Sequence, residues 1–429
     1  MIRRTAFPVF ALVIAVAAPV WAESPAPVDF GREVRPLLAE KCFICHGLDA
    51  AKRETSLRLD TKEGLFAELE SGDGVAIMPG NADKSVVYRR LVHEDAEQRM
   101  PPAEGKPLTD AEIATIKRWI DEGAVWQEHW SFVAPTRPEL PEVQDVVWPR
   151  SAIDRFVLKQ LEGRQLAPSP QADAVTLLRR VTYDLTGLPP TLAEVDRFLT
   201  EARGGAAGAK LTTAEHGAPL PRLDQAYEAA VERLLNSPRY GEHMARYWLD
   251  AARYGDTHGL HLDNFREIWP YRDWVVRAFN QNKPFDQFTI EQLAGDLLPN
   301  PTRDQLIATG FNRCNVTTSE GGVIPEEYYV HYTNDRVSTM STVWMGVSMG
   351  CVTCHEHKFD PFEMKDFYQL FAFFNSLDGP VMDGNKKDTA PVLRVASDQQ
   401  QAELDELAGR IAELVKSMEA PQEQVDQAQ

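Results

Sequence analysis

The chain has 429 residues, of which 43% are hydrophobic and 25% charged, and its formal net charge is −19. This composition is typical of a soluble globular protein, and the length predicts two to four domains. The acidic balance argues against a protein that binds nucleic acid through its phosphates, and a partner with a basic surface is the better expectation.

Residues 1–22 are predicted to be a secretory signal peptide. Arg3 and Arg4 precede an apolar run over residues 6–19, and Ala22 ends a cleavage pattern of small residues. The run is too short to span a bilayer comfortably, although a retained anchor is the alternative. The sequence therefore predicts an exported protein, either periplasmic or on the cell surface.

The first domain is expected over residues 29–126, where a helix near residues 30–38 leads into a Cys-Phe-Ile-Cys-His motif. Two thiols separated by two residues and followed by histidine form the attachment site of a c-type haem. Each thiol adds to one vinyl group of the porphyrin, and the imidazole ligates the iron. We therefore predict that Cys42 and Cys45 bind haem c and that His46 is a metal ligand.

Met100 is the predicted sixth ligand of this first iron. It lies in a Met-Pro-Pro loop, and Thr109 with Glu112 forms a capping box at the start of a closing helix. A helix before the motif, a methionine in a proline-stiffened loop and a closing helix is the order of a small class I-type cytochrome c. A thioether ligand favours the ferrous iron. Met78 and an open or histidine-ligated iron are the alternatives.

A proline-rich linker over residues 127–147 is expected to precede a larger, all-helical domain over residues 148–378. Helix signals in it include a capping box of Thr191 with Glu194, and Ser237 as an N-cap before a proline. Four apolar residues are expected on one face of a helix: Ile153, Phe156, Val157 and Leu161. A Gly/Ala/Thr-rich stretch over residues 204–221 is interpreted as a surface insertion.

A second haem motif lies in this domain, after a helix expected over about residues 326–350. Cys351 and Cys354 are the predicted attachment residues, and His355 is the predicted metal ligand. A shared four-thiolate zinc site, a thioredoxin-like pair and structural disulfides are the alternatives at both motifs. The candidates for the sixth ligand are His258, His261, His331, His357, Met345 and Met349.

Two further features of this domain are expected to be structural. Cys314 is interpreted as a buried free thiol. Four arginines alternate with four aspartates between residues 246 and 273, and these either pair between packed helices or line a polar pocket. The members are Arg246, Asp250, Arg253, Asp256, Asp263, Arg266, Arg272 and Asp273.

Residues 398–420 are predicted to form a coiled-coil segment. Apolar residues step by three and four along it, as in a short heptad seam: Leu404, Leu407, Ile411, Leu414 and Met418. Two heptads are marginal alone, so a coiled-coil partner is expected. The predicted fold is mainly α, with a small class I-type cytochrome c domain, a larger helical domain and this short tail.

With these residues in view, the chain resembles a family of exported planctomycete-type proteins. Residues 30–126 are similar to the planctomycete cytochrome c domain, through Cys42-Phe43-Ile44-Cys45-His46-Gly47, Met100-Pro101-Pro102 and Trp119-Ile120-Asp121-Glu122-Gly123-Ala124. Residues 148–376 resemble the cytochrome-like domain of unknown function that follows it, through Ser237-Pro238-Arg239-Tyr240-Gly241-Glu242 and Cys354-His355-Glu356-His357-Lys358-Phe359-Asp360-Pro361. The resemblance implies haem binding and electron transfer. It also implies a further domain after the coiled coil, so the tail is expected to be truncated.

The sequence leaves two functional hypotheses in competition with a scaffold role. An electron carrier with one or two covalent haems and a periplasmic redox partner is favoured, because a His/Met-ligated iron is suited to electron transfer. The alternative is a di-haem oxidoreductase that acts on an unknown substrate, with a carbohydrate as one candidate, since the helical domain is larger than a carrier needs.

Overall fold

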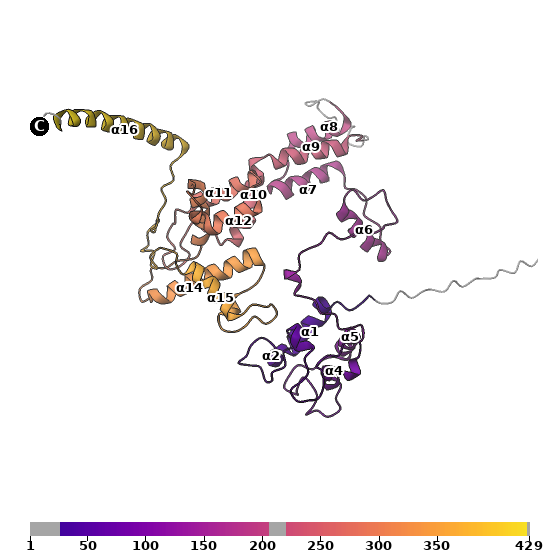
Figure 1. The fold of residues 1–429 in the computed structure, drawn as a ribbon. Helices are drawn as coiled ribbons and strands as arrows, with labels where there is room; N and C mark the ends of the chain where they lie inside the picture. The colour runs from indigo at the N-terminus through magenta and orange to yellow at the C-terminus, as the bar shows by residue number, and fades with distance from the viewer. Residues whose placement is uncertain (1–25, 206–219, 427–429) are drawn as a thin grey trace, which may run out of the picture. The chain divides into compact units, whose positions relative to one another are not determined.

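The computed structural model describes residues 26–205 and 220–426 (Figure 1), and within these ranges the chain is mainly α-helical, with isolated β-bridges and no strand. The predicted signal peptide and most of the predicted insertion lie outside the described residues. The mainly α fold expected from the sequence is confirmed. No helix in the described part of the chain is long and apolar enough to cross a membrane.

The chain divides into two compact units. The first unit contains residues up to Thr136 together with residues 355–363. Its helices are short: a π-helical turn (Phe30–Val34), α1 (Arg35–Lys41), α2 (Phe43–His46), α3 (Lys62–Leu65), α4 (Val86–Leu91) and α5 (Asp110–Asp121). The predicted capping box at α5 is confirmed, because the Thr109 hydroxyl accepts the Glu112 N–H and the Glu112 carboxylate accepts the Thr109 N–H.

One apolar core holds the first unit together. Phe30 stacks on Trp119 with ring centroids 5.1 Å apart, and Leu38, Leu65, Ile77 and Ile120 are buried around them. The end of α5 also anchors two distant segments through its acidic side chains. Asp121 accepts the Ala82 N–H at 3.0 Å and Glu122 accepts the Val28 N–H at 2.7 Å. The Trp-Ile-Asp-Glu string therefore joins the core to the loops around it.

The second unit contains residues from Arg137 to Cys354 and from Met364 onward. Its helices are α6 (Ala152–Gly163), α7 (Ala174–Thr186), α8 (Leu192–Arg203), α9 (Leu223–Leu235), α10 (Pro238–Ala251), α11 (Trp269–Asn280), α12 (Phe285–Ala294), α13 (Arg303–Ala308), α14 (Pro325–Met340), α15 (Met364–Phe374) and α16 (Asp398–Asp426). Short 3₁₀ and π turns lie between them. The predicted caps at Thr191 and Ser237 are confirmed at the starts of α8 and α10.

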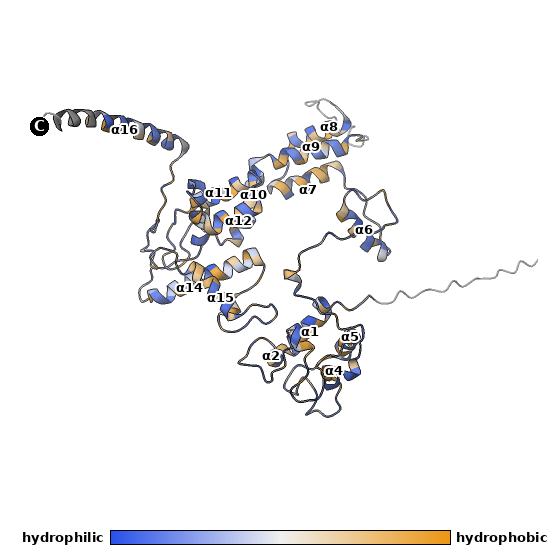
Figure 2. Cartoon of the chain, in the orientation of Figure 1, coloured by the Kyte–Doolittle hydropathy of each residue, from blue (hydrophilic) through white to orange (hydrophobic). Residues whose placement is uncertain are grey.

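Two apolar clusters hold the second unit. The first joins α7, α8 and α9 through Leu178, Phe198 and Ala226, and the hydrophobic residues of α7 are prominent in Figure 2. The second joins α10 to α13 around aromatic side chains, among them Tyr271 and Trp274. Cys314 lies in this second cluster, 1% exposed and without a disulfide, so its prediction as a buried free thiol is confirmed.

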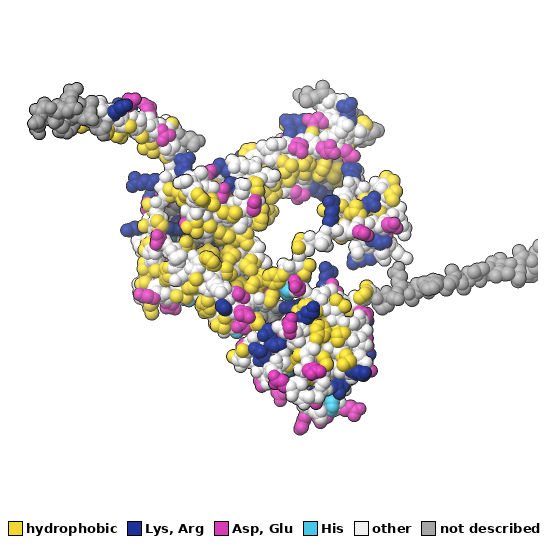
Figure 3. Space-filling model, viewed as in Figure 1, with side chains coloured by type: hydrophobic (Ala, Val, Ile, Leu, Met, Phe, Trp, Pro, Cys, Tyr) yellow, Lys and Arg dark blue, Asp and Glu magenta, His cyan; other side chains and the backbone are white. Residues whose placement is uncertain are grey.

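Two details of the helical prediction differ from the structure, and a third observation concerns the predicted coiled-coil segment. The helix expected over residues 326–350 ends earlier, because α14 passes into a π turn at Ser341–Met345 and Gly346 then adopts the left-handed conformation with φ of 65°. On α6, Ile153, Phe156 and Val157 are exposed and Leu158 is the buried residue. On α16 the heptad residues are also exposed, as the hydrophobic side chains along this helix in Figure 3 show.

Candidate haem sites

The first motif occupies a single turn of helix at the junction of α1 and α2. The carbonyl of Cys42 accepts the N–H of Cys45 at 3.1 Å and the N–H of His46 at 2.9 Å. This bonding places Cys42, Cys45 and His46 within one turn, with two residues between the cysteines. The three residues that the sequence predicted as one site are therefore adjacent in the fold, and both thiols are free to form thioethers.

Burial sets the chemistry of the first thiol. Cys42 packs against the core of the first unit, and burial, with a smaller contribution from Cys45, raises the pKa of the free Cys42 thiol to about 12. A thiol with this pKa is fully protonated at neutral pH and a poor nucleophile when no haem is attached. Cys45 is also half-buried, and it follows the exposed Ile44.

The imidazole of His46 is held from the loop that follows the motif. Its Nδ1 lies 3.2 Å from the Thr55 hydroxyl, and the backbone N–H of Leu59 donates to the His46 carbonyl at 2.8 Å. Burial lowers the pKa of His46, while a backbone hydrogen bond at Leu57 opposes that shift. A neutral imidazole bonded at Nδ1 is the form that presents Nε2 to a metal, so these residues fit a haem iron. Sequence reasoning missed Thr55, because no spacing rule links it to His46.

The two methionine candidates lie in different surroundings. Met100 is 40% exposed, and its backbone N–H donates to the Arg90 carbonyl at 2.9 Å. Met78 is half-buried, and its N–H donates at 2.8 Å to the hydroxyl of Ser85, which is fully buried. Met100 as the sixth ligand stays a prediction, with Met78 as its alternative.

The second motif lies on an exposed 3₁₀ turn at Gly350–Thr353. Cys351 and Cys354 are exposed and free, whereas Val352 between them is fully buried and anchors the turn. The Tyr368 hydroxyl on α15 donates to the Thr353 carbonyl at 3.0 Å. His355 Nδ1 lies 2.8 Å from the Glu356 carbonyl oxygen, to which it can only donate. Its Nε2 then carries the lone pair that a metal needs.

His258 cannot serve as a sixth ligand in this fold. It is 2% exposed, its Nδ1 lies 2.7 Å from the Thr317 hydroxyl and its Nε2 lies 2.7 Å from the Lys386 carbonyl. Asp383 accepts from Thr317 and completes the cluster, which ties three loops of the second unit together. Both ring nitrogens are engaged, so this candidate is structural.

The other candidate ligands differ in access. Met349 is fully buried, whereas Met345 is exposed. His331 is exposed and lies 3.4 Å from Glu327 on the same helix. His357 Nδ1 accepts the backbone N–H of Asp360 at 2.9 Å. The sixth ligand of the second site is not assigned by these contacts.

The alternating charges after residue 246 do not form one network. Arg253 pairs with Asp335 of α14 at 2.8 Å, and Arg266 donates to backbone carbonyls, among them that of Asn315 at 2.9 Å. Arg272 pairs with its neighbour Asp273 at 2.9 Å. Arg246 instead lies over the ring of Tyr247, with its guanidinium carbon 4.7 Å from the ring centroid.

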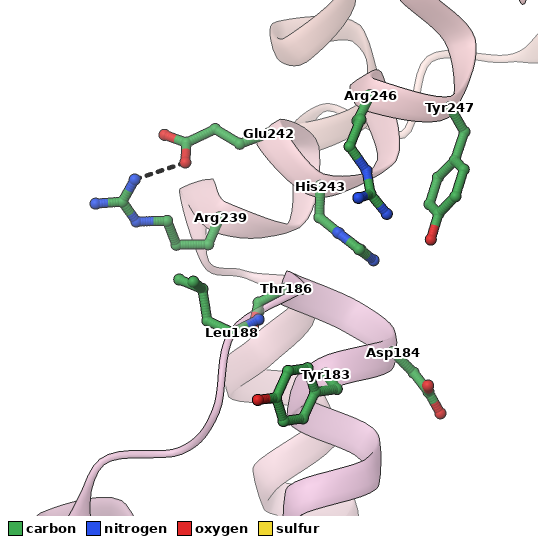
Figure 4. Close-up of a pocket in the computed structure, with 10 residues that line it drawn as sticks. Tyr183, Asp184, Thr186, Leu188, Arg239, Glu242, His243, Arg246 and Tyr247 are labelled. Carbon is green, nitrogen blue, oxygen red and sulfur yellow. Dashed lines mark hydrogen bonds and ion pairs between the residues drawn. The ribbon is translucent and has the colours of Figure 1, made fainter. Parts of the chain in front are cut away.

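Arg246 faces a pocket of about 680 Å³ between the end of α7 and the first half of α10 (Figure 4). From α10 the lining side chains are Arg239, Glu242, His243, Arg246 and Tyr247; from α7 and the turn after it they are Tyr183, Asp184, Thr186, Gly187 and Leu188. Arg246 is the member of the alternating charges that lines this pocket, whereas no spacing in the sequence marks the other lining residues.

The chain matches two models of protein families. The model of the planctomycete cytochrome C domain covers residues 42–104, which begin at the first thiol of the first motif. The model described as PSCyt2, a protein of unknown function (DUF1549), covers residues 152–379 and thus includes the second motif. The second match alone spans more than half of the chain. No curated protein and no solved structure matches the chain.

Proposed function

The chain belongs to the PSCyt2 family and carries a planctomycete cytochrome c domain ahead of the PSCyt2 region, and from this premise we propose that it is an exported c-type cytochrome that transfers electrons. The observation that carries the proposal is the first motif. Cys42, Cys45 and His46 share one helical turn at the start of the matched cytochrome c domain.

Each residue of the first site has a defined role in the proposal. Cys42 and Cys45 would hold haem c through thioethers, and the imidazole of His46 would ligate its iron. The bound haem supplies an iron that takes up and gives back one electron. Thr55 orients the imidazole from Nδ1. Met100 is proposed as a further ligand, whose thioether would complete the coordination of the iron and favour electron transfer over substrate chemistry.

A second haem is proposed at Cys351 and Cys354, with His355 as its ligand. The exposure of both thiols and the hydrogen bond of His355 Nδ1 to the Glu356 carbonyl support this proposal. The engagement of both nitrogens of His258 removes one of the six candidates for a further ligand at this iron. An open position is what the alternative function, a di-haem oxidoreductase, requires.

The proposal extends to location and partners. An exported carrier exchanges electrons with a periplasmic redox partner protein, and the acidic chain favours a partner with a basic surface. The exposed heptad residues on α16 support a coiled-coil partner for that helix.

The test is a haem-to-protein ratio with oxidised and reduced spectra, measured on protein matured in a periplasm, with and without carbon monoxide. Two matched variants lack one motif each: Cys42→Ser with Cys45→Ser, and Cys351→Ser with Cys354→Ser. We expect two haems in the parent chain and one in each variant.

The carbon monoxide measurement separates the two functions. No spectral shift means that both irons have six ligands, as the carrier requires. A shift that disappears in the Cys351/Cys354 variant locates an open iron at the second motif and favours the oxidoreductase. A Cys42/Cys45 variant that keeps the full haem content refutes the first site.

A further inference from the structure

The pocket between α7 and α10 is built so that two helices present polar and aromatic groups to one space. In Figure 4 the side chains of His243, Arg246 and Tyr247 extend from α10 toward the end of α7, where Tyr183 and Asp184 project on different sides of that helix. Its volume of about 680 Å³ lies within the range of about 300–1,000 Å³ of small-molecule sites.

A glycine makes room for the floor of the pocket. Gly187 ends α7 in the left-handed conformation, with φ of 68°, and a Cβ at this position would lie 2.4 Å from Nδ1 of His243. A side chain here would therefore displace the imidazole. The turn after α7 and the ring of His243 fit together only because residue 187 has no side chain.

The charges that line the pocket are balanced. Arg239 and Glu242 neutralise each other through an ion pair of 2.6 Å on its rim. Arg246 and Asp184 form no ion pair within residues 26–205 and 220–426. The Arg246 guanidinium therefore has unused hydrogen-bond donors, and the Asp184 carboxylate has unused acceptors. A ligand with a net charge would neutralise one of these two side chains and repel the other. The hydroxyl groups of a neutral ligand can accept hydrogen bonds from Arg246 and donate hydrogen bonds to Asp184.

Two aromatic rings complete the lining. Tyr247 is 58% exposed and Tyr183 is 38% exposed. Arginines lie over both rings: Arg246 over Tyr247 at 4.7 Å and Arg179 over Tyr183 at 5.0 Å. These contacts restrict the two tyrosine side chains before a ligand binds, so less side-chain conformational entropy is lost on binding. An exposed tyrosine offers a flat apolar face with a polar edge, which suits the C–H faces of a sugar ring.

From this lining we propose that the pocket binds a neutral oligosaccharide. Arg246 and Asp184 hydrogen-bond its hydroxyl groups, and Tyr247 packs against a sugar ring. The inference goes beyond electron transfer and does not depend on haem, since every residue named lies on α7, α10 or the turn between α7 and α8.

The test uses the full-length protein with its haem attached. Binding is screened on a glycan array that carries neutral and uronate-containing oligosaccharides, and the best neutral tetrasaccharide is then titrated by calorimetry. Arg246→Ala, Asp184→Asn and Tyr247→Ala are expected to weaken its affinity at least tenfold each. Tyr247→Phe keeps the ring and is expected to stay within threefold of the parent.

Phe285→Ala is the matched control, because Phe285 is 66% exposed on α12 and does not line the pocket. It is expected to leave the affinity unchanged. Circular dichroism and the haem spectrum, identical in all variants, separate loss of binding from loss of folding and from failure of the haem assignment. The proposal is overturned if no neutral oligosaccharide binds, if uronate-containing ones bind more tightly, or if the pocket variants bind like the control.

Discussion

A close approach of α10 and α11 in the second unit depends on Gly241. This residue is buried on α10, where a Cβ would lie 2.4 Å from the carbonyl oxygen of Val276 and 2.5 Å from Cγ of Asn280, both on α11. The Gly241 N–H also donates to the Asn280 side chain at 2.8 Å. A carbonyl oxygen within a helix cannot rotate away from a new methyl group, so Gly241→Ala must move the two helices apart.

The expected cost follows from three contributions. Overpacking of this kind costs about 1–3 kcal/mol, and loss of the bond between Gly241 and Asn280 adds about 1 kcal/mol. Alanine gains about 1 kcal/mol over glycine through its helix propensity. The net prediction is that Gly241→Ala lowers the free energy of unfolding of the second unit by about 1–3 kcal/mol.

Urea unfolding followed by tryptophan fluorescence measures this change, because Trp248, Trp274 and Trp344 belong to the aromatic cluster of the second unit. Gly163→Ala at the end of α6 is the matched control, since a Cβ there meets nothing within 4 Å. It is expected to stabilise by up to about 1 kcal/mol. If Gly241→Ala raises the urea midpoint as this control does, the inference that α10 and α11 leave no room for a methyl group at residue 241 is wrong.

Three further predictions concern single side chains. Burial alone would raise the pKa of Asp383, but the hydrogen bonds that its carboxylate accepts outweigh burial, so the pKa is lowered in the folded protein. The ionised Asp383 therefore stabilises the fold above the ordinary carboxyl pKa of about 4. This stabilisation is lost as the pH falls through the lower pKa of the folded protein. Asp383→Asn should therefore melt at a lower temperature than the parent at pH 7. A difference in melting temperature between the two proteins that does not narrow below about pH 4 would contradict this. Burial raises the pKa of Cys314 to about 12, so iodoacetamide should alkylate this thiol at least 100-fold faster in urea than in the native protein at pH 8, and similar rates would refute its burial. Thr55→Val removes the hydrogen bond at His46 Nδ1 and should raise the haem reduction potential, because a less basic imidazole stabilises ferric iron less; Thr55→Ser, which keeps the hydroxyl, should leave the potential near that of the parent.

Helix starts could be predicted from the sequence because their physics is local. Thr109, Thr191 and Ser237 each cap a helix through a backbone N–H two or three residues away, so the short pattern contains both partners. The early end of α14 could not be predicted in the same way. Gly346 takes a positive φ, but the apolar residues on both sides of it continue a helical spacing that hides the break.

The interactions of arginine and histidine side chains were the least predictable, because their partners lie far along the chain. The sequence places Arg253 near Asp250 and Asp256, yet its ion pair is with Asp335. His258 is one of six candidate ligands by sequence, with a structural histidine as the favoured interpretation, and only the folded loops bring Thr317 and the Lys386 carbonyl to its two nitrogens. Long-range polar contacts of this kind are fixed by tertiary packing and leave no periodic signal.

The two residues proposed as ligands of the first iron also differ in whether their positions are set by local or by long-range contacts. His46 directly follows Cys45 in the sequence and forms hydrogen bonds with a loop that begins within ten residues of it. Its position therefore follows from the local chain. Met100 lies in a segment more than fifty residues further along the chain, and its own backbone N–H donates to the Arg90 carbonyl rather than to the loop that holds His46. The proline-stiffened loop explains how such a segment keeps its shape, but it does not determine where the sulfur lies. The position of His46 is therefore a consequence of the motif, whereas the position of Met100 depends on the tertiary packing of the first unit.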